Sequence, residues 1–174
     1  MKKTIFILIT IFLIYYIIGV ASEEIIKIPD EAIRFRVIAN SNSTQDQDVK
    51  YKVKDEVESY MASILQNVDN IDESRAIIST NLDNISNKVT NVFNRNNYKL
   101  NYVVNFGLNY FPEKEFKGIT YDEGYYESLV ITIGEGKGNN WWCVLFPPLC
   151  MLEAEESTDV EYKSFLKEIV DKYI

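Results

Sequence analysis

The chain has 174 residues, of which 47% are hydrophobic, so it suits one globular domain of roughly 150 residues behind a targeting segment, which excludes a largely disordered chain. Lys and Arg number 18 against 26 Asp and Glu, and the net charge of −8 disfavours nucleic acid and other phosphate-rich partners. The sequence has no histidine, which excludes Ser-His and Cys-His nucleophile pairs, imidazole general bases and most catalytic zinc sites.

The start of the chain predicts export. Residues 1–3 are basic, and residues 4–20 carry no charge. This pattern is typical of a secretory signal, but its length is also close to that of a membrane span, so a cleaved signal and an uncleaved anchor both fit. The small residues Gly19 and Ala21 suit cleavage before Ser22. The predicted organisation is residues 1–21, signal peptide or membrane anchor; residues 22–31, tether; and residues 32–174, a single α+β domain.

A strand and a helix are predicted at the start of the domain. Over residues 32–39, apolar residues alternate with polar ones, which is the period of a strand and places Arg34 and Arg36 on one face. We expect this face to be solvated, unless the arginines receive a carboxylate from a partner. Ser43 or Thr44 can cap the following helix. The helix is expected to end near Asn67, and its apolar stripe consists of Val49, Val53, Val57, Met61, Ile64, Leu65 and Val68.

The remaining elements are mostly strands. Apolar residues at helical spacing predict a second helix over residues 72–93, and a C-terminal helix is predicted after a cap at Ser157 or Thr158. Strands are predicted over residues 98–110, 129–133 and 141–146, with one more short strand within residues 116–126. The order strand, helix, helix, several strands, helix predicts an α+β fold with a mainly antiparallel sheet.

Residues 139–152 are an uncharged stretch in a chain that is 25% charged. Because neighbouring strand residues point to opposite faces, Trp141 and Trp142 are expected on opposite sides of their strand. Two interpretations remain open: a central strand covered on both faces, or an exposed aromatic patch that binds a partner. The glycines that precede this stretch fit a turn with positive φ better than a phosphate-binding loop.

Cys143 and Cys150 are the two cysteines of the chain. Seven positions separate them, so a disulfide requires the chain to reverse at Pro147 and Pro148. Export permits oxidation, and a disulfide and two buried thiols both remain open. Cys143 has no histidine to activate it as a nucleophile and lies among apolar residues that raise a thiol pKa.

The acidic residues do not predict a catalytic or metal site. They lie where helices are expected to begin, and negative charge is favourable there. The first pair also lacks the glycine and the distal glutamate of a calcium-binding loop. We therefore expect no catalytic residue, no cofactor and no metal. The acidic residues in question are Asp46, Asp48, Asp69, Asp72 and Glu73.

Three segments together resemble a known family: residues 33–43 (IRFRVIANSNS), 46–57 (DQDVKYKVKDEV) and 134–150 (GEGKGNNWWCVLFPPLC). They are similar to stage II sporulation protein R, and the third is the most specific because it combines a glycine-rich turn, paired Trp and two Cys around Pro-Pro. The resemblance implies a signal made in the forespore and exported into the space between the two sporulation membranes. It implies activation there of a membrane-embedded aspartic protease, stage II sporulation protein GA, which removes the pro-segment of the sigma-E precursor in the mother cell.

This resemblance implies a protease activator that is not an enzyme and that touches the membrane only through an uncleaved N-terminal segment. An exported module that binds peptidoglycan or glycan by aromatic stacking is the alternative. The family provides no individual contact residues, so the candidates come from the residue types alone. They are Trp141, Trp142, Phe146 and the turn residues Gly134, Gly136 and Gly138, followed by Arg34 and Arg36.

Overall fold

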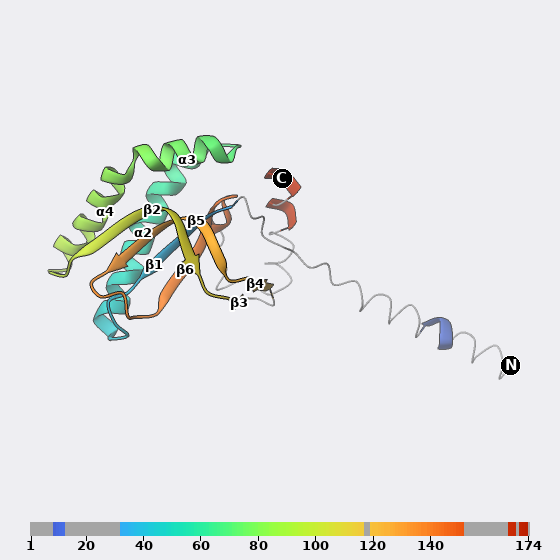
Figure 1. Cartoon of the computed structure of the whole chain (residues 1–174), viewed down its shortest axis with the longest axis horizontal. Coiled ribbons are helices and arrows are strands. Elements are labelled where there is room, and N and C mark those ends of the chain that lie inside the picture. The colour runs from blue at the N-terminus through green and yellow to red at the C-terminus, as the bar shows by residue number, and fades with distance from the viewer. Residues whose placement is uncertain (1–8, 13–31, 117–118, 152–166, 170, 174) are drawn as a thin grey trace.

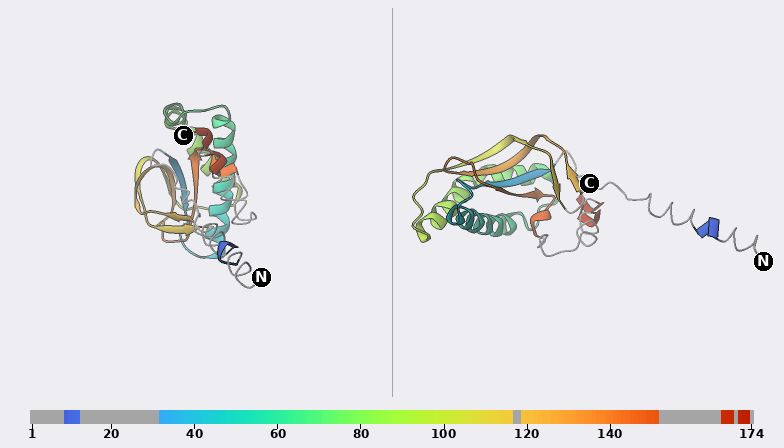
Figure 2. Two further views of the ribbon diagram at one scale, coloured as in Figure 1. Left: turned by 90° about the vertical axis from the view of Figure 1, so that its right-hand side faces the viewer. Right: turned by 90° about the horizontal axis from the view of Figure 1, so that it is seen from below.

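The computed structural model describes residues 9–12, 32–116, 119–151, 167–169 and 171–173. Within these residues, four strands form one sheet in the order β2-β5-β1-β6, and two more form a separate hairpin. The helices lie on one face of the sheet (Figures 1 and 2). The elements are β1 (Ile33–Ile38), α2 (Thr44–Leu65), α3 (Ile71–Thr80), α4 (Leu82–Arg95), β2 (Tyr102–Phe111), β3 (Lys114–Phe116), β4 (Ile119–Tyr121), β5 (Gly124–Ile133), β6 (Asn140–Phe146) and the 3-10 helix η1 (Leu149–Met151).

The sheet is mixed. β2 pairs antiparallel with β5, and β6 pairs antiparallel with β1. The central pair, β1 and β5, is parallel, with Arg34 opposite Ser128. The α+β class agrees with the prediction, but the sheet is less antiparallel than expected. Three helices connect β1 to β2, and β5 then returns beside β1 in the parallel direction.

The core lies between the sheet and the helices. Ser43 caps α2, as predicted, by accepting a hydrogen bond from the backbone N–H of Asp46 over 3.2 Å. The apolar stripe of α2 then packs on the apolar face of β1, and α4 packs beside α2. Fully buried side chains of this core include Ile33, Phe35, Val37, Val53, Val57, Ile85, Val89, Leu129, Ile131 and Ile133.

The predicted second helix is two helices. The chain bends at Asn81, between α3 and α4, although no glycine or proline is present there. The side chain of Asn81 accepts a hydrogen bond from the Tyr60 hydroxyl (2.7 Å) and donates one to the Ile77 carbonyl (2.9 Å). These bonds hold the bend, which places α3 so that Arg75 forms an ion pair with Glu127 of β5.

β6 is an edge strand, so its interpretation as a central strand was wrong. It pairs with β1 alone among the described strands. Its uncharged sequence has another explanation, because α2 covers one face of β6 and side chains of β2 reach the other. Two covered faces make a strand apolar even when one edge has no neighbouring strand.

The predicted signal and tether lie outside the described residues, apart from a helical turn at residues 9–12, and so do the predicted caps Ser157 and Thr158. Residues 167–169 and 171–173 are helical, in agreement with the predicted C-terminal helix. In the described part of the chain, every helix is too short or too polar to cross a membrane.

Candidate partner-binding surface

The face of the sheet that points away from the helices carries a cluster of cations and aromatic rings. Arg34 and Arg36 lie on this face of β1, and Trp142 of β6 lies directly opposite Arg36. The expected solvation of both arginines was wrong for Arg34, which is only 6% exposed. We name this group the outer-face cluster; its members are Arg34, Arg36, Phe111, Lys114, Tyr126 and Trp142.

Arg34 is buried because aromatic rings enclose it. Its guanidinium carbon lies 3.3 Å from the centroid of the Tyr126 ring and 5.4 Å from that of Phe111. Contact with the face of an aromatic ring stabilises a cation that has lost part of its hydration. Arg34 therefore belongs to the packed base of the outer-face cluster and not to its accessible part.

Arg36 is the accessible arginine of the cluster and is half-buried. It lies 5.4 Å from the Phe111 centroid and 5.7 Å from the Trp142 centroid. Its Nη1 donates to the Tyr110 carbonyl over 3.1 Å, and its Nε and Nη2 donate to the Asn140 amide oxygen when that oxygen faces them. Burial lowers the pKa of Arg36 below its usual value, and within the described residues no carboxylate forms an ion pair with it.

The outer-face cluster exists because the sheet curls. Phe111, at the end of β2, meets Trp142 of β6 with 5.4 Å between ring centroids, although β5 and β1 lie between these two strands. Along β2 the buried side switches at Gly107, where φ is 157°. Before this glycine the even-numbered residues face the helices, and after it Asn109 and Phe111 are covered on the outer face. The Lys114 ammonium of β3 then lies 4.7 Å from the Trp142 centroid.

Trp141 lies on the opposite face of β6, as strand alternation predicts. Its ring meets Phe35 edge-on at 5.6 Å, and the Lys54 ammonium of α2 lies 5.0 Å from its centroid. Burial alone would lower the pKa of Lys54, but its hydrogen bonds and ion pairs with Glu58 and Asp55 together outweigh burial and raise this pKa. The two tryptophans are therefore separate, and only Trp142 belongs to the outer-face cluster.

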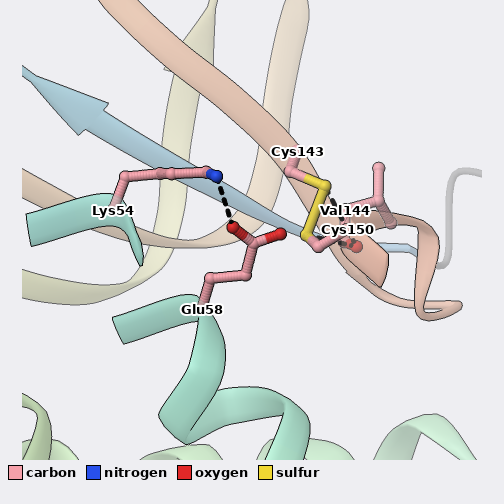
Figure 3. The surroundings of a disulfide bond; sticks show 5 residues. All are labelled: Lys54, Glu58, Cys143, Val144 and Cys150. Atoms are coloured by element: carbon pink, nitrogen blue, oxygen red, sulfur yellow. Dashed lines mark hydrogen bonds and ion pairs between the residues drawn. A yellow bond between two sulfur atoms is a disulfide. The ribbon is translucent and has the colours of Figure 1, made fainter. Parts of the chain in front are cut away.

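Cys143 and Cys150 form a disulfide beside the Lys54–Glu58 ion pair (Figure 3). Their Cα atoms are 5.5 Å apart, because the chain reverses at Pro147 and Pro148 after a cis Phe146–Pro147 peptide bond. The disulfide holds η1 against the end of β6. Of the two interpretations that the sequence left open, the structure has the bonded pair.

Phe146 lies in the core. It is buried, and its ring meets Tyr173 of the C-terminal helical residues with 5.5 Å between centroids. A partner cannot reach a buried ring without displacing this packing. We therefore assign Phe146 to the fold and do not keep it among the candidate contacts.

The glycine turn is packed against its own chain, at the end of the sheet where β1 and β5 finish side by side. Gly134 and Gly136 have φ values of 56° and 63°, which favour glycine. A Cβ atom on Gly138 would lie 2.3 Å from the Ser41 carbonyl oxygen. Nearby, the Asn40 side chain accepts a hydrogen bond from the Glu135 N–H over 3.0 Å. The glycines allow this close approach of two turns.

Asp46 holds the same region together, a role that its helix-capping position did not reveal. Its buried carboxylate accepts hydrogen bonds from Asn40 (2.8 Å), Ser41 (2.5 Å) and Tyr98 (2.5 Å). Burial alone would raise the pKa of Asp46, but these hydrogen bonds outweigh it and lower the pKa to about 2. Tyr98 has a raised pKa, through burial and then through its bond to Asp46. In the sequence, the one available signal of this role was the polar turn directly before a helix with an Asp in its first turn.

The other polar groups do not form a chemical site. A groove between α2 and α4 is lined by charged side chains, but these pair with each other, as Glu56 does with Lys88 and Arg95. In the part of the chain that the structure describes, no group of three or more His, Cys, Asp and Glu residues is placed to hold a metal ion. The outer-face cluster therefore remains the best candidate site, and its chemistry is that of binding.

Fold and site together define a small α+β domain with a curled sheet, a disulfide and a cation-rich aromatic face. The family model described as stage II sporulation protein R (spore_II_R) matches residues 29–156. Stage II sporulation protein R of Bacillus subtilis (strain 168) is 38% identical over 163 residues, which cover 88% of this chain and 73% of that protein. No solved structure matches the chain. The chain belongs to the stage II sporulation protein R family, and its role is in sporulation.

Proposed function

We propose that this chain is an exported sporulation signal that activates a membrane-embedded aspartic protease, stage II sporulation protein GA, and so triggers processing of the sigma-E precursor. Membership of the stage II sporulation protein R family supports a sporulation role. The basic start and uncharged residues 4–20 support export from the forespore. The acidic, histidine-free composition supports a messenger that carries out no catalysis itself.

The outer-face cluster is the observation that carries the proposed contact with the protease. Arg36 is a half-buried cation whose hydrogen bonds in the described residues go to neutral oxygens. A partner carboxylate beside it would gain a charge-assisted hydrogen bond in a partly desolvated setting. Trp142 next to it is half-buried, and its accessible part adds aromatic surface of a kind that often contributes to binding energy.

Such a contact activates the protease only through a difference in affinity. The domain must bind the active arrangement of the protease more tightly than the inactive one, and each tenfold difference is worth about 1.4 kcal/mol. A shift from mostly inactive to mostly active protease requires roughly 10⁴-fold preference. A face with a few strong contacts, such as Arg36 and Trp142, is suited to this task.

Glycan stacking is less well supported than protein binding. Each indole already has a cation and an aromatic ring against it: Lys114 and Phe111 at Trp142, and Lys54 and Phe35 at Trp141. A sugar needs an open ring face on which to stack. Binding of the purified protein to cell-wall sacculi that is lost in Trp142→Ala would favour the glycan alternative.

Reconstitution in a host that does not sporulate tests the proposed function. The protease and the sigma-E precursor are expressed together with this chain, either complete or without residues 1–21, and cleavage of the precursor is followed by immunoblot. We expect cleavage only with the complete, exported chain. If the protease is active and the exported chain is folded but no cleavage follows, direct activation is wrong.

A further inference from the structure

The open edge of β2 lacks two common protections of an edge strand, charged residues and proline. β2 is the terminal strand of the sheet and pairs with β5 alone among the described strands. Residues 100–111 contain no charged residue and no proline. Natural proteins commonly protect such edges with lysine, proline, bulges or very short strands, because unpaired backbone groups otherwise bind another strand.

Apolar side chains are exposed along this same strand. Leu100 is 41% exposed, Val103 is 63% exposed and Leu108 is 74% exposed. Val103 lies on the outer face, whereas the even-numbered Leu108 lies on the helix face by strand alternation. Both faces of the edge therefore offer apolar surface beside unpaired backbone.

The backbone groups that point outward belong to the even-numbered residues. The Gly134 N–H donates to the Asn101 carbonyl over 2.7 Å, so Asn101 turns its backbone groups toward β5. In an antiparallel ladder this direction alternates from one residue to the next. Tyr102, Val104 and Phe106 therefore turn their N–H and C=O groups toward the open edge.

We propose that this edge pairs with the same edge of a second copy of the chain, antiparallel and centred on Val104. In this register, Val104 exchanges backbone hydrogen bonds with Val104 of the second copy across a two-fold axis. Leu100 then lies opposite Leu108 of the second copy, and Val103 lies diagonal to Val103 of the second copy. The exposed apolar side chains of one edge thus cover those of the other.

The charge distribution favours a second copy as the occupant. Two chains with a net charge of −8 repel each other, and an edge free of charge from residue 100 to residue 111 is where they can approach without placing like charges together. The same register places the flanking Lys99 opposite the neutral Asn109 of the second copy. The even-numbered side chains match about Val104, Leu100 with Leu108 and Tyr102 with Phe106, which suits a two-fold axis between two copies.

The oligomeric state of the complete chain, as a secreting host exports it, tests the pairing. Sedimentation should show an average mass that rises toward that of a dimer as concentration increases. Val103→Lys places two ammonium groups diagonally across the axis, and we expect it to weaken association at least tenfold. Gln66→Lys is the control, because it adds the same charge at an exposed residue at the end of α2, a helix that packs against β1, β6 and α4. A wild-type chain that stays monomeric overturns the inference.

Cross-linking tests the register. Leu100→Cys and Leu108→Cys proteins are each treated with a short bis-maleimide, alone and as an equal mixture. Equivalent positions in the two copies are eight residues apart (108 − 100), or about 27 Å, which exceeds the linker. We expect a cross-linked dimer in the mixture and none in either protein alone. Cross-linking of one variant alone, or none in the mixture, contradicts pairing centred on Val104.

Discussion

Asp46 accepts hydrogen bonds from Asn40, Ser41 and Tyr98, which come from the turn after β1 and from the segment after α4. One buried carboxylate thus ties the start of α2 to a distant part of the chain. Three donors directed at one carboxylate stabilise its charged form and oppose its protonation. At the scale of single residues, loss of this interaction should therefore destabilise the fold.

The stability of the domain should therefore decrease in acid. The pKa of Asp46 is about 2 in the folded protein, below its ordinary value of 3.8. Because the folded pKa is depressed, the stabilisation is present above pH 4 and is lost as pH falls through the range from 4 to 2. The charged Asp46 carboxylate contributes about 2 kcal/mol to the free energy of unfolding. Urea unfolding at a series of pH values measures this dependence.

Asp46→Asn should lower the free energy of unfolding by about 2 kcal/mol at neutral pH and flatten its dependence on acid. The amide replaces one carboxylate oxygen with an NH2 group, which then faces other hydrogen-bond donors. Asp48→Asn is the control, since Asp48 is exposed and pairs with Lys52 on the surface of α2. An Asp46→Asn protein with the wild-type acid profile would show that another group titrates.

At the scale of elements, the two turns beside Asp46 depend on glycine. A Cβ atom on Gly138 would lie 2.3 Å from the Ser41 carbonyl oxygen, and this neighbour is backbone that cannot rotate away. Gly138→Ala should therefore lower the free energy of unfolding by about 2 kcal/mol. Glu135→Ala in the same turn is exposed and should change it by less than about 0.5 kcal/mol. Equal thermal unfolding of both variants would contradict the close packing of the turns.

The sequence predicted the elements better than their arrangement. Hydrophobic periodicity identified β1, α2 and β2, because their apolar residues repeat at the period of each element, and β6 was identified as an uncharged apolar run. The break at Asn81 had no such signal, since the apolar spacing continues through it and tertiary hydrogen bonds from Tyr60 hold the bend. Parallel pairing of β1 with β5 depends on contacts between distant segments, which periodicity does not report.

The sequence predicted two central residues of the candidate site but not the residues that pack against them. Trp142 and Arg36 were chosen from the sequence, and the structure places them side by side. Phe111 and Tyr126, which complete the cluster, come from strands distant in the sequence, and Phe111 meets Trp142 across two intervening strands because the sheet curls. A local pattern carries no information on such long-range curvature.

At the scale of the whole molecule, two surfaces have separate tasks. The outer-face cluster is proposed to bind the protease, and the open edge of β2 is proposed to bind a second copy. The first is rich in cations and rings, and the second is uncharged. A variant of one surface should therefore leave the task of the other intact.

The most direct test of the account compares Arg36→Gln with Lys52→Gln in the reconstituted processing assay, at equal amounts of folded, exported protein. Both changes remove one positive charge, but Lys52 lies on α2, away from the outer-face cluster. Cleavage of the sigma-E precursor should require at least tenfold more of the Arg36→Gln protein, while Lys52→Gln should match the wild type. Equal cleavage by both variants would contradict activation through the outer-face cluster.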